Sequence, residues 1–302
     1  MPFSLLIVTV FTELDSTLPT ICASTPKDSD ILIIDPAKDT GATPIDLKLS
    51  SRYMFAILGG ILPVLLLAFL ITFFDDKIHN PQVLETLSSI PLVGVIGKNT
   101  LENNLVVHLK PKSTIAEGFR SVRFSLQYFY KKHNLEGTKT VMITSSVSGE
   151  GKTFCCINIA TVFALSNKKT ILVGLDLRKP KIFGDFAIQN DIGVVNYLIG
   201  QDALEDVIQH TEIEFLDVIT SGPVPPNPSE LLINDKLNEL ISTLKTKYDY
   251  IVLDTPPVGL VSDAMELLEY VDASLYVVRQ DYTKRGMLNF INEKHKTKQI
   301  KN

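Results

Sequence analysis

The sequence has few of the residues that mark metal-binding, redox or nucleic-acid-binding proteins. Its 302 residues include three cysteines, Cys22, Cys155 and Cys156. The adjacent pair lacks the spacing of zinc ligands, so we interpret these two cysteines as small packing residues in a reducing compartment. The formal net charge is −5. Without a basic excess, nucleic acid is not a favoured partner.

Charge is absent from one long apolar run. Residues 54–74, MFAILGGILPVLLLAFLITFF, contain no charged side chain over 21 positions. A helix of this length spans a hydrocarbon core of about 30 Å. Such runs are rare in the cores of soluble proteins, so we predict one transmembrane helix, within which Gly59, Gly60 and Pro63 are tolerated.

The residues after this run alternate between short apolar segments and helical stretches. The apolar segments are rich in β-branched residues and do not alternate with polar ones, as in strands buried on both faces. We therefore predict a doubly wound α/β fold with a mostly parallel sheet and with ligands at the carboxyl ends of its strands. The predicted strands are residues 141–145, 170–175, 215–221, 250–255 and 273–279.

A glycine-rich loop follows the first predicted strand. The stretch SSVSGEGKT, residues 145–153, fits a Walker A pattern in which Ser146 replaces the leading glycine. The glycines let backbone N–H groups face phosphates, the lysine reaches the β- and γ-phosphates, and the threonine hydroxyl binds Mg²⁺. A plain glycine turn is the alternative, which the flanking strand and helix disfavour. The predicted ATP-binding residues are Ser148, Gly149, Glu150, Gly151, Lys152, Thr153 and Phe154.

Two further strands end in residues suited to phosphoryl transfer. Asp254 ends the run YDYIVLD and fits a Walker B aspartate, which holds Mg²⁺. Asp176 and Arg178 follow the run ILVGL. We predict Asp176 as a metal ligand or proton acceptor, and Arg178 as a nucleotide contact. Each aspartate could instead cap its strand, but three such sites on one sheet edge favour function. Lys152, Asp176 and Asp254 are thus the predicted catalytic residues, and Thr153, Asp176 and Asp254 the metal ligands.

Four regions are expected along the chain. Because cellular ATP is cytoplasmic, we place the nucleotide-binding domain, 105–302, in the cytoplasm and a short piece, 1–53, outside. The segment 54–74 crosses the membrane. Residues 75–104 form a juxtamembrane link, whose stretch QVLETLSSIPLVGVIG predicts a short helix and then a strand. The first run, MPFSLLIVTVF, is a poor signal peptide, and we interpret it as a strand or the remnant of a larger segment.

The ordered set of motifs resembles a known family, the bacterial tyrosine kinases of polysaccharide co-polymerases, which act in capsule and exopolysaccharide export. The motifs are IIDPAKDTGATPID before the apolar run, then LSSIPLVGVIG, EGFRSVR, SSVSGEGKT, ILVGLDLRKP, GPVPPNPSELL and YDYIVLDTPPV. The resemblance implies ATP- and Mg²⁺-dependent tyrosine phosphorylation between neighbours in a homo-oligomeric ring at the bacterial inner membrane, with polysaccharide export machinery as partner. It implies the same roles for Lys152, Thr153, Asp176 and Asp254, and ring contacts for Glu117, Arg120 and Arg123.

The sequence departs from the family pattern in three respects. Gly174 replaces the first aspartate of the family's second motif, which removes a carboxylate near the metal. No tyrosine follows Tyr282, where the family has a further strand and a tyrosine-rich tail, so a C-terminally truncated reading frame is one interpretation. Residues 1–53 are too few for the family's extracytoplasmic domain and earlier membrane helix.

These departures leave two other hypotheses open. The chain could be a catalytically weak or inactive chain-length regulator or scaffold, which Gly174 favours. It could also be a Min/Par-type membrane ATPase, but those proteins carry a lysine at the position of Val147 and bind membranes reversibly. The acceptor tyrosine is left open, since the tyrosines are scattered and the closest pairs are Tyr128/Tyr130 and Tyr248/Tyr250.

Overall fold

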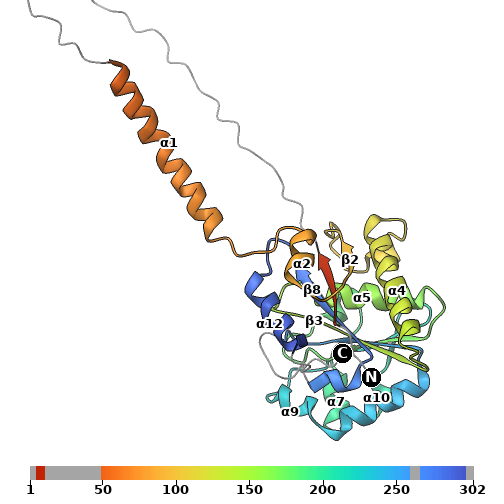
Figure 1. The fold of residues 1–302 in the computed structure, drawn as a ribbon. Helices are drawn as coiled ribbons and strands as arrows, with labels where there is room; N and C mark the ends of the chain where they lie inside the picture. Colours follow the sequence, from red (N-terminus) through yellow and green to blue (C-terminus); the bar gives the residue numbers. More distant parts are fainter. Residues whose placement is uncertain (1–4, 11–48, 259–265, 297–302) are drawn as a thin grey trace, which may run out of the picture. The chain divides into compact units, whose positions relative to one another are not determined.

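The computed structural model describes residues 5–10, 49–258 and 266–296 and divides the chain into two compact units (Figure 1). One unit contains α1, Leu49–Phe73. Within this helix the run Tyr53–Phe73 has a mean hydropathy of 2.7, and none of it is buried. A helix that is apolar on every side and uncovered by protein suits a membrane. Its position agrees with the predicted span at 54–74.

The other unit is built on one eight-stranded sheet of order β2-β1-β8-β3-β7-β4-β6-β5 (Figure 1). All neighbouring strands are parallel except β5 and β6. Each strand predicted in the nucleotide-binding domain is present, so the mostly parallel α/β sheet is confirmed. The strands are β1 Leu5–Val10, β2 Leu92–Ile96, β3 Lys139–Ser145, β4 Thr170–Gly174, β5 Gln209–His210, β6 Leu216–Ile219, β7 Tyr250–Asp254 and β8 Ala273–Arg279.

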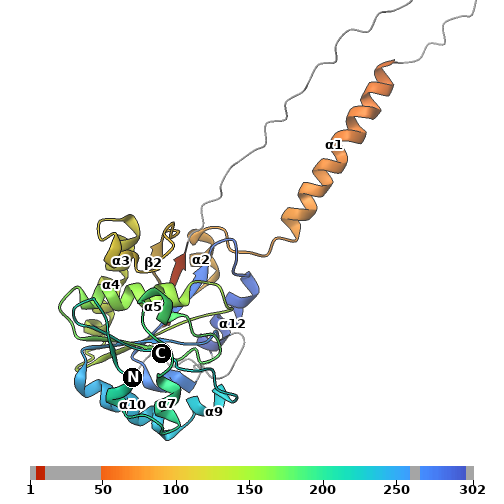
Figure 2. The same ribbon diagram turned by 180° about the vertical axis from the view of Figure 1, so that it is seen from behind.

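Helices cover both faces of the sheet (Figures 1 and 2). In β3, Val141 and Ile143 join one apolar core while Met142 joins the other. Burial of each such side chain contributes about 1.5–3 kcal/mol. The first core lies under α3 Val106–Leu109, α4 Thr114–Lys132 and α5 Lys152–Ala164. The second lies under α2 Pro81–Leu87, α7 Val194–Leu198, α8 Leu204–Val207, α9 Pro228–Leu232, α10 Asp235–Lys247, the 3₁₀ helix η1 Leu267–Tyr270 and α12 Arg285–Lys296. The short α6, Ile182–Asp185, follows β4.

The strand register gathers the predicted site at one edge of the sheet. Asp254, the last residue of β7, pairs with Ile143 of β3 on one side and with Gly174 of β4 on the other. The three strands therefore end together, because they are parallel. The loops that follow β3 and β4 flank Asp254, as the doubly wound fold predicts.

The juxtamembrane link forms the predicted helix and strand, α2 and β2. Pro81 starts α2, where its missing N–H costs nothing. Both elements belong to the same compact unit as the residues after 105. The structure therefore has no unit boundary at the predicted junction between 104 and 105.

The first strand, β1, differs from the expected arrangement. It lies between β2 and β8, and its residues from Leu5 to Val10 pair in parallel with those from Ser274 to Arg279. The interpretation of this run as a strand is confirmed. The expectation that residues 1–53 lie outside the cytoplasm stays a prediction. It is incompatible with the pairing of Leu5–Val10 if the sheet is cytoplasmic, because a strand lies on the same side of a membrane as the sheet that pairs with it. The remainder of that piece before α1, including Cys22, lies outside the described residues.

Candidate nucleotide-binding site

The loop between β3 and α5 has the backbone of a phosphate-binding loop. Gly149 has φ of 92° and Gly151 has φ of 99°, in the left-handed region that favours glycine. The helix α5 begins at Lys152, so the free N–H groups of its first turn face the loop. Backbone donors and the positive end of a helix therefore meet where the Walker A pattern places phosphates.

A cavity of about 220 Å³ opens beside this loop. Asp176 lies on its wall and accepts the N–H of Lys179 at 3.2 Å, which orders the turn after β4. Lys179 and Lys181 add two cations that the motifs did not predict as site residues, although they stand three and five positions after Asp176 in the chain. The lining residues are Asn104, Ser148, Gly149, Gly151, Lys152, Thr153, Phe154, Asp176, Lys179 and Lys181.

Asn104 was not predicted from the sequence either, because a hydrogen bond from Asn158, far away in the sequence, holds it at the cavity. The side chain of Asn158, buried on α5, donates to the backbone oxygen of Asn104 at 2.7 Å. The Oδ1 of Asn158 accepts the N–H of Val107 at 2.9 Å. This one amide therefore fixes the segment that carries Asn104 against the helix that starts at the P-loop.

Asp254 is a buried carboxylate next to the P-loop threonine. Its side chain is 2% exposed, and the Thr153 hydroxyl donates to Oδ2 at 2.9 Å. Burial raises the pKa of Asp254 to about 6, and the charge of nearby Lys152 lowers it in part. Lys152 is itself 6% exposed. The site thus holds a carboxylate whose charge is costly until a cation reaches it.

These residues fit a Mg²⁺ ion that is shared with a nucleotide. Carboxylate and hydroxyl oxygens are the hard ligands that Mg²⁺ prefers, and the ion is usually held by one or two carboxylates together with phosphates. Thr153 and Asp254 supply one oxygen of each kind in contact. In the described part of the chain, His, Cys, Asp and Glu do not cluster in threes. The phosphates of a nucleotide would therefore complete the coordination.

The two cysteines of α5 pack as predicted. Both are fully buried, and burial raises the pKa of Cys155 to about 12. The Cys156 thiol lies 3.4 Å from Asp254 Oδ1. A protonated thiol in this position donates a weak hydrogen bond to the carboxylate and is not a nucleophile.

The side chains of two predicted nucleotide contacts, Glu150 and Arg178, form hydrogen bonds within the protein. Glu150 is fully buried behind the loop, where one carboxylate oxygen accepts the Val147 N–H at 2.9 Å and the other contacts the Thr283 hydroxyl. Burial raises the pKa of Glu150. Arg178 donates to the Ser229 hydroxyl at 2.7 Å. Neither residue is among those that line the cavity, so Glu150 supports the loop and Arg178 fixes the turn after β4 to α9.

The predicted ring-contact residues lie on α4, away from the cavity. Arg120 pairs with Glu117 one turn earlier and donates to the Pro111 carbonyl. Arg123 donates to the Val162 carbonyl at 3.1 Å, so it ties α4 to α5. Glu117 and Arg120 thus remain on the surface of the helix, whereas Arg123 has a structural contact within the chain.

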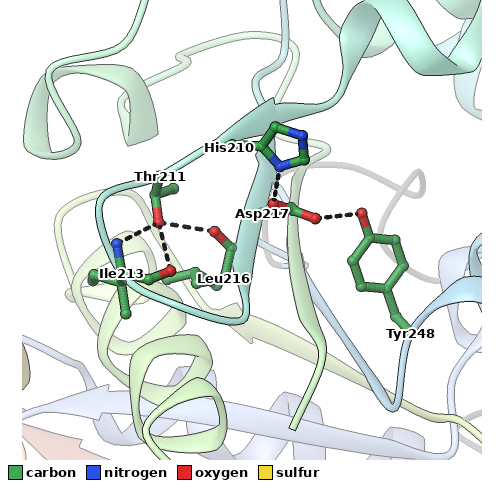
Figure 3. Close-up of polar contacts among 6 residues, drawn as sticks. All are labelled: His210, Thr211, Ile213, Leu216, Asp217 and Tyr248. Atoms are coloured by element: carbon green, nitrogen blue, oxygen red, sulfur yellow. Dashed lines mark hydrogen bonds and ion pairs between the residues drawn. The ribbon is translucent and has the colours of Figure 1, made fainter. Parts of the chain in front are cut away.

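The tyrosine pair Tyr248 and Tyr250 lies far from the P-loop. Tyr248 and Tyr250 lie at the amino end of β7, whereas the P-loop follows the carboxyl end of the parallel β3. Tyr248 Oη donates to Asp217 at 2.7 Å, and His210 contacts the other oxygen of this carboxylate at 2.6 Å (Figure 3). Burial and this hydrogen bond raise the pKa of Tyr248. Its hydroxyl is therefore engaged and hard to ionise.

The fold and the site define a P-loop nucleotide-binding α/β domain. A family model described as an AAA domain matches residues 138–302. Tyrosine-protein kinase YwqD of Bacillus subtilis (strain 168) is 36% identical over 185 residues, which cover 61% of this chain and 77% of YwqD.

Solved structures agree with this match. The chimerical protein CapA2B2 is similar with a TM-score of 0.64 and 33% identity, over 73% of this chain and 92% of that one. The kinase domain of Escherichia coli tyrosine kinase ETK is similar with a TM-score of 0.61 and 32% identity, over 68% and 79%. The chain belongs to the bacterial tyrosine-protein kinases, a family of AAA-type P-loop domains, as its motifs indicate.

Proposed function

We propose that the chain is an ATP-dependent kinase that phosphorylates tyrosines on neighbouring copies of itself and regulates capsule or exopolysaccharide production. The observation that supports this most directly is the convergence of Lys152, Thr153, Asp254 and Asp176 at one sheet edge. Three of them line a cavity beside a P-loop, and Asp254 is held to that loop by Thr153. Family membership supplies tyrosine as the acceptor class.

The residues can perform an in-line phosphoryl transfer. The loop and the first turn of α5 hold the phosphates of ATP, and Lys152 neutralises charge that develops between the β- and γ-phosphates. The phenol oxygen of the acceptor attacks the γ-phosphorus, and the bond from this phosphorus to the bridging oxygen breaks. Asp176 accepts the phenol proton. The products are phosphotyrosine and ADP.

Mg²⁺ would be held by Thr153 and Asp254 and would supply Lewis-acid stabilisation of the phosphate oxygens. The protein's own contribution is the position of the carboxylate. Because Asp254 is buried and hydrogen-bonded to Thr153, it needs little rearrangement to meet the cation.

The cellular setting follows from α1 and from the family. We place α1 in the bacterial inner membrane and the P-loop domain on its cytoplasmic side. Neighbouring copies form a ring through α4, with Glu117 and Arg120 at the surface and Arg123 behind them. The polysaccharide export machinery is the proposed partner.

The test is a phosphotyrosine assay of the full-length chain with Mg²⁺ and ATP. Lys152→Met should abolish the signal without lowering the thermal midpoint of unfolding. Lys168→Met is a matched control, because Lys168 is exposed just beyond the far end of α5 and should leave the signal unchanged. Undiminished phosphorylation in Lys152→Met would contradict the proposal.

Gly174 supports a second candidate function, a regulator or scaffold that binds nucleotide but transfers phosphate weakly. The family's first aspartate is missing at this position, next to Asp254 in the sheet register. This alternative expects ATP binding in wild type and no phosphotyrosine in either protein. The same assay, accompanied by an ATP-binding measurement, therefore separates the two functions.

A further inference from the structure

One exposed tyrosine touches the P-loop. Among the described residues outside α1, Tyr128 is 65% exposed and Tyr282 is 44% exposed, whereas Tyr130, Tyr250 and Tyr276 are buried. Tyr282 lies in the turn that follows β8, and its hydroxyl donates to the backbone oxygen of Ser148 at 3.0 Å. Tyr282 therefore combines the accessibility of a phosphorylation acceptor with a direct contact to the nucleotide loop.

The turn that carries Tyr282, residues 279–283, contacts three consecutive P-loop residues. We call it the β8 turn. Arg279 donates to the Gly149 carbonyl at 2.7 Å, next to the Tyr282 bond. The hydroxyl of Thr283 contacts the buried carboxylate of Glu150. Ser148, Gly149 and Glu150 are thus each held by one side chain of this turn.

The backbone of the β8 turn is itself fixed. Asp281 has a left-handed backbone with φ of 57°. Its N–H donates to the Ile78 carbonyl at 2.9 Å, and the Ile78 N–H donates to the Thr283 carbonyl at 3.0 Å. Ile78 is fully buried. The turn can therefore keep its place while the exposed Tyr282 ring changes its rotamer.

We propose that Tyr282 is a phosphorylation site and that its modification opens the contact between the β8 turn and the P-loop, which lowers nucleotide affinity. This inference rests on the proposed kinase function. In the reaction, the Tyr282 oxygen attacks the γ-phosphorus of ATP bound to a second copy. The bond between that phosphorus and the bridging oxygen of ADP breaks, and the phenol proton passes to the Asp176 carboxylate of the second copy. ADP leaves, and Tyr282 carries the phosphate.

The phosphate cannot be accommodated in the present contact. The Tyr282 oxygen lies 3.0 Å from Ser148 O and 3.0 Å from the point that a β-carbon on Gly149 would occupy. A phosphate ester on this oxygen also removes the proton donated to Ser148. The ring must therefore turn outward, and Ser148 loses its partner.

Arg279 would follow the phosphate. Its guanidinium lies over the Tyr282 ring, 5.2 Å from the ring centre. A phosphate dianion forms stronger hydrogen bonds with arginine than a neutral carbonyl does. The guanidinium would exchange the Gly149 carbonyl for the phosphate, so one modification would release two of the three side-chain contacts. The added negative charge would also lie close to a loop that binds phosphates.

The first experiment maps the phosphate by mass spectrometry. The full-length chain in detergent is incubated with Mg²⁺ and ATP and digested with trypsin, which should yield the peptide QDYTK, residues 280–284. We expect phosphate on this peptide in wild type and none in Tyr282→Phe. Phosphotyrosine at other positions with Tyr282 unmodified would overturn this inference alone. The absence of phosphotyrosine anywhere would contradict the proposed kinase function as well.

The second experiment measures the affinity for a fluorescent ADP analogue, whose binding to the unphosphorylated variants does not depend on kinase activity. Tyr282→Phe loses one hydrogen bond to the loop and should bind roughly 2- to 10-fold more weakly. The phosphorylated wild-type chain should bind still more weakly, by roughly tenfold or more. Tyr128→Phe, on the exposed face of α4, is the matched control and should bind normally.

Equal affinity in the phosphorylated and unphosphorylated chains would overturn the proposal. So would full affinity in Tyr282→Phe together with Tyr282→Glu. Thermal unfolding of each variant separates these results from misfolding, because a purely structural role would lower the midpoint and leave the affinity of the folded fraction unchanged. Weaker binding of the ADP analogue by Lys152→Met would confirm that the analogue occupies the P-loop.

Discussion

The hydroxyl of Ser221 occupies the space beside Gly174 into which a side chain would project. A β-carbon on Gly174 would lie 2.9 Å from Ser221 Oγ and 3.1 Å from Ser221 N. The same hydroxyl donates to the Gly174 carbonyl at 2.9 Å. Ser221 therefore fills the space next to Gly174, so that the aspartate found here in the family would have no room for its carboxylate.

Replacing Gly174 by the family's aspartate should destabilise this protein. We expect Gly174→Asp to lower the free energy of unfolding by about 1–3 kcal/mol, because overpacking forces Ser221 to move, and not to increase phosphotransfer. Gly174→Asp combined with Ser221→Ala should recover part of the stability. Urea unfolding and a phosphotyrosine assay check both variants. If Gly174→Asp were fully stable and more active, the packing around Gly174 would not explain the missing aspartate, and the substitution would simply have cost the protein activity.

The buried charge of Asp254 should make the nucleotide-free protein less stable above pH 6. Its pKa is raised from 3.8 to about 6, so between these values the folded state binds more protons than the unfolded state. Stability therefore falls as the pH rises through this window. Two pKa units correspond to about 3 kcal/mol.

Asp254→Asn should accordingly stabilise the nucleotide-free chain at pH 7.5 by up to about 3 kcal/mol and give little gain near pH 4. It should also lose the stabilisation that wild type gains from Mg²⁺ and ADP. Chemical denaturation at the two pH values measures this. Asp191→Asn removes one exposed carboxylate and serves as the control. A loss of stability at pH 7.5 would contradict the account of Asp254.

Asn158 should matter to both stability and affinity. Its side chain bonds Asn104 O at 2.7 Å, Phe154 O at 2.8 Å and the Val107 N–H at 2.9 Å. Asn158→Ala removes all three bonds and leaves the buried Val107 N–H unpaired, so we expect a loss of about 2–4 kcal/mol. ADP should also bind more weakly, because Asn104 lines the cavity. Asn238→Ala on the exposed face of α10 should have little effect on either quantity.

The apolar surface of α1 should determine membrane association. Leu66 lies near the middle of the helix and is 54% exposed. Leu66→Arg should reduce the fraction of protein in the membrane pellet, since an arginine at the centre of a span costs about 2.5–3.5 kcal/mol. Leu109→Arg changes an equally exposed leucine outside α1 and should remain in the pellet. Unchanged pelleting of Leu66→Arg would show that another part of the chain binds the membrane.

Sequence patterns predict the parts of this protein that depend on local order. The strands around Val141 and Val252 follow from β-branched runs, and Lys152 and Asp254 follow from their positions at strand ends. The contacts of Asn158 with Asn104 and of Thr283 with Glu150 were not predicted, because each joins residues far apart in the chain. The close approach of Ser221 to Gly174 was not predicted either, because it joins the segment after β6 to the end of β4.

The position of β1 has a topological consequence for the whole chain. A bilayer cannot pass through a sheet, and β1 precedes α1 while its partner β8 follows it. The residues between β1 and α1 contain no second uncharged run long enough to cross. In one polypeptide, a single crossing by α1 and the pairing of β1 with β8 therefore exclude each other. Insertion of α1 would withdraw β1 and leave the facing edges of β2 and β8 open to another strand from the cytoplasmic side.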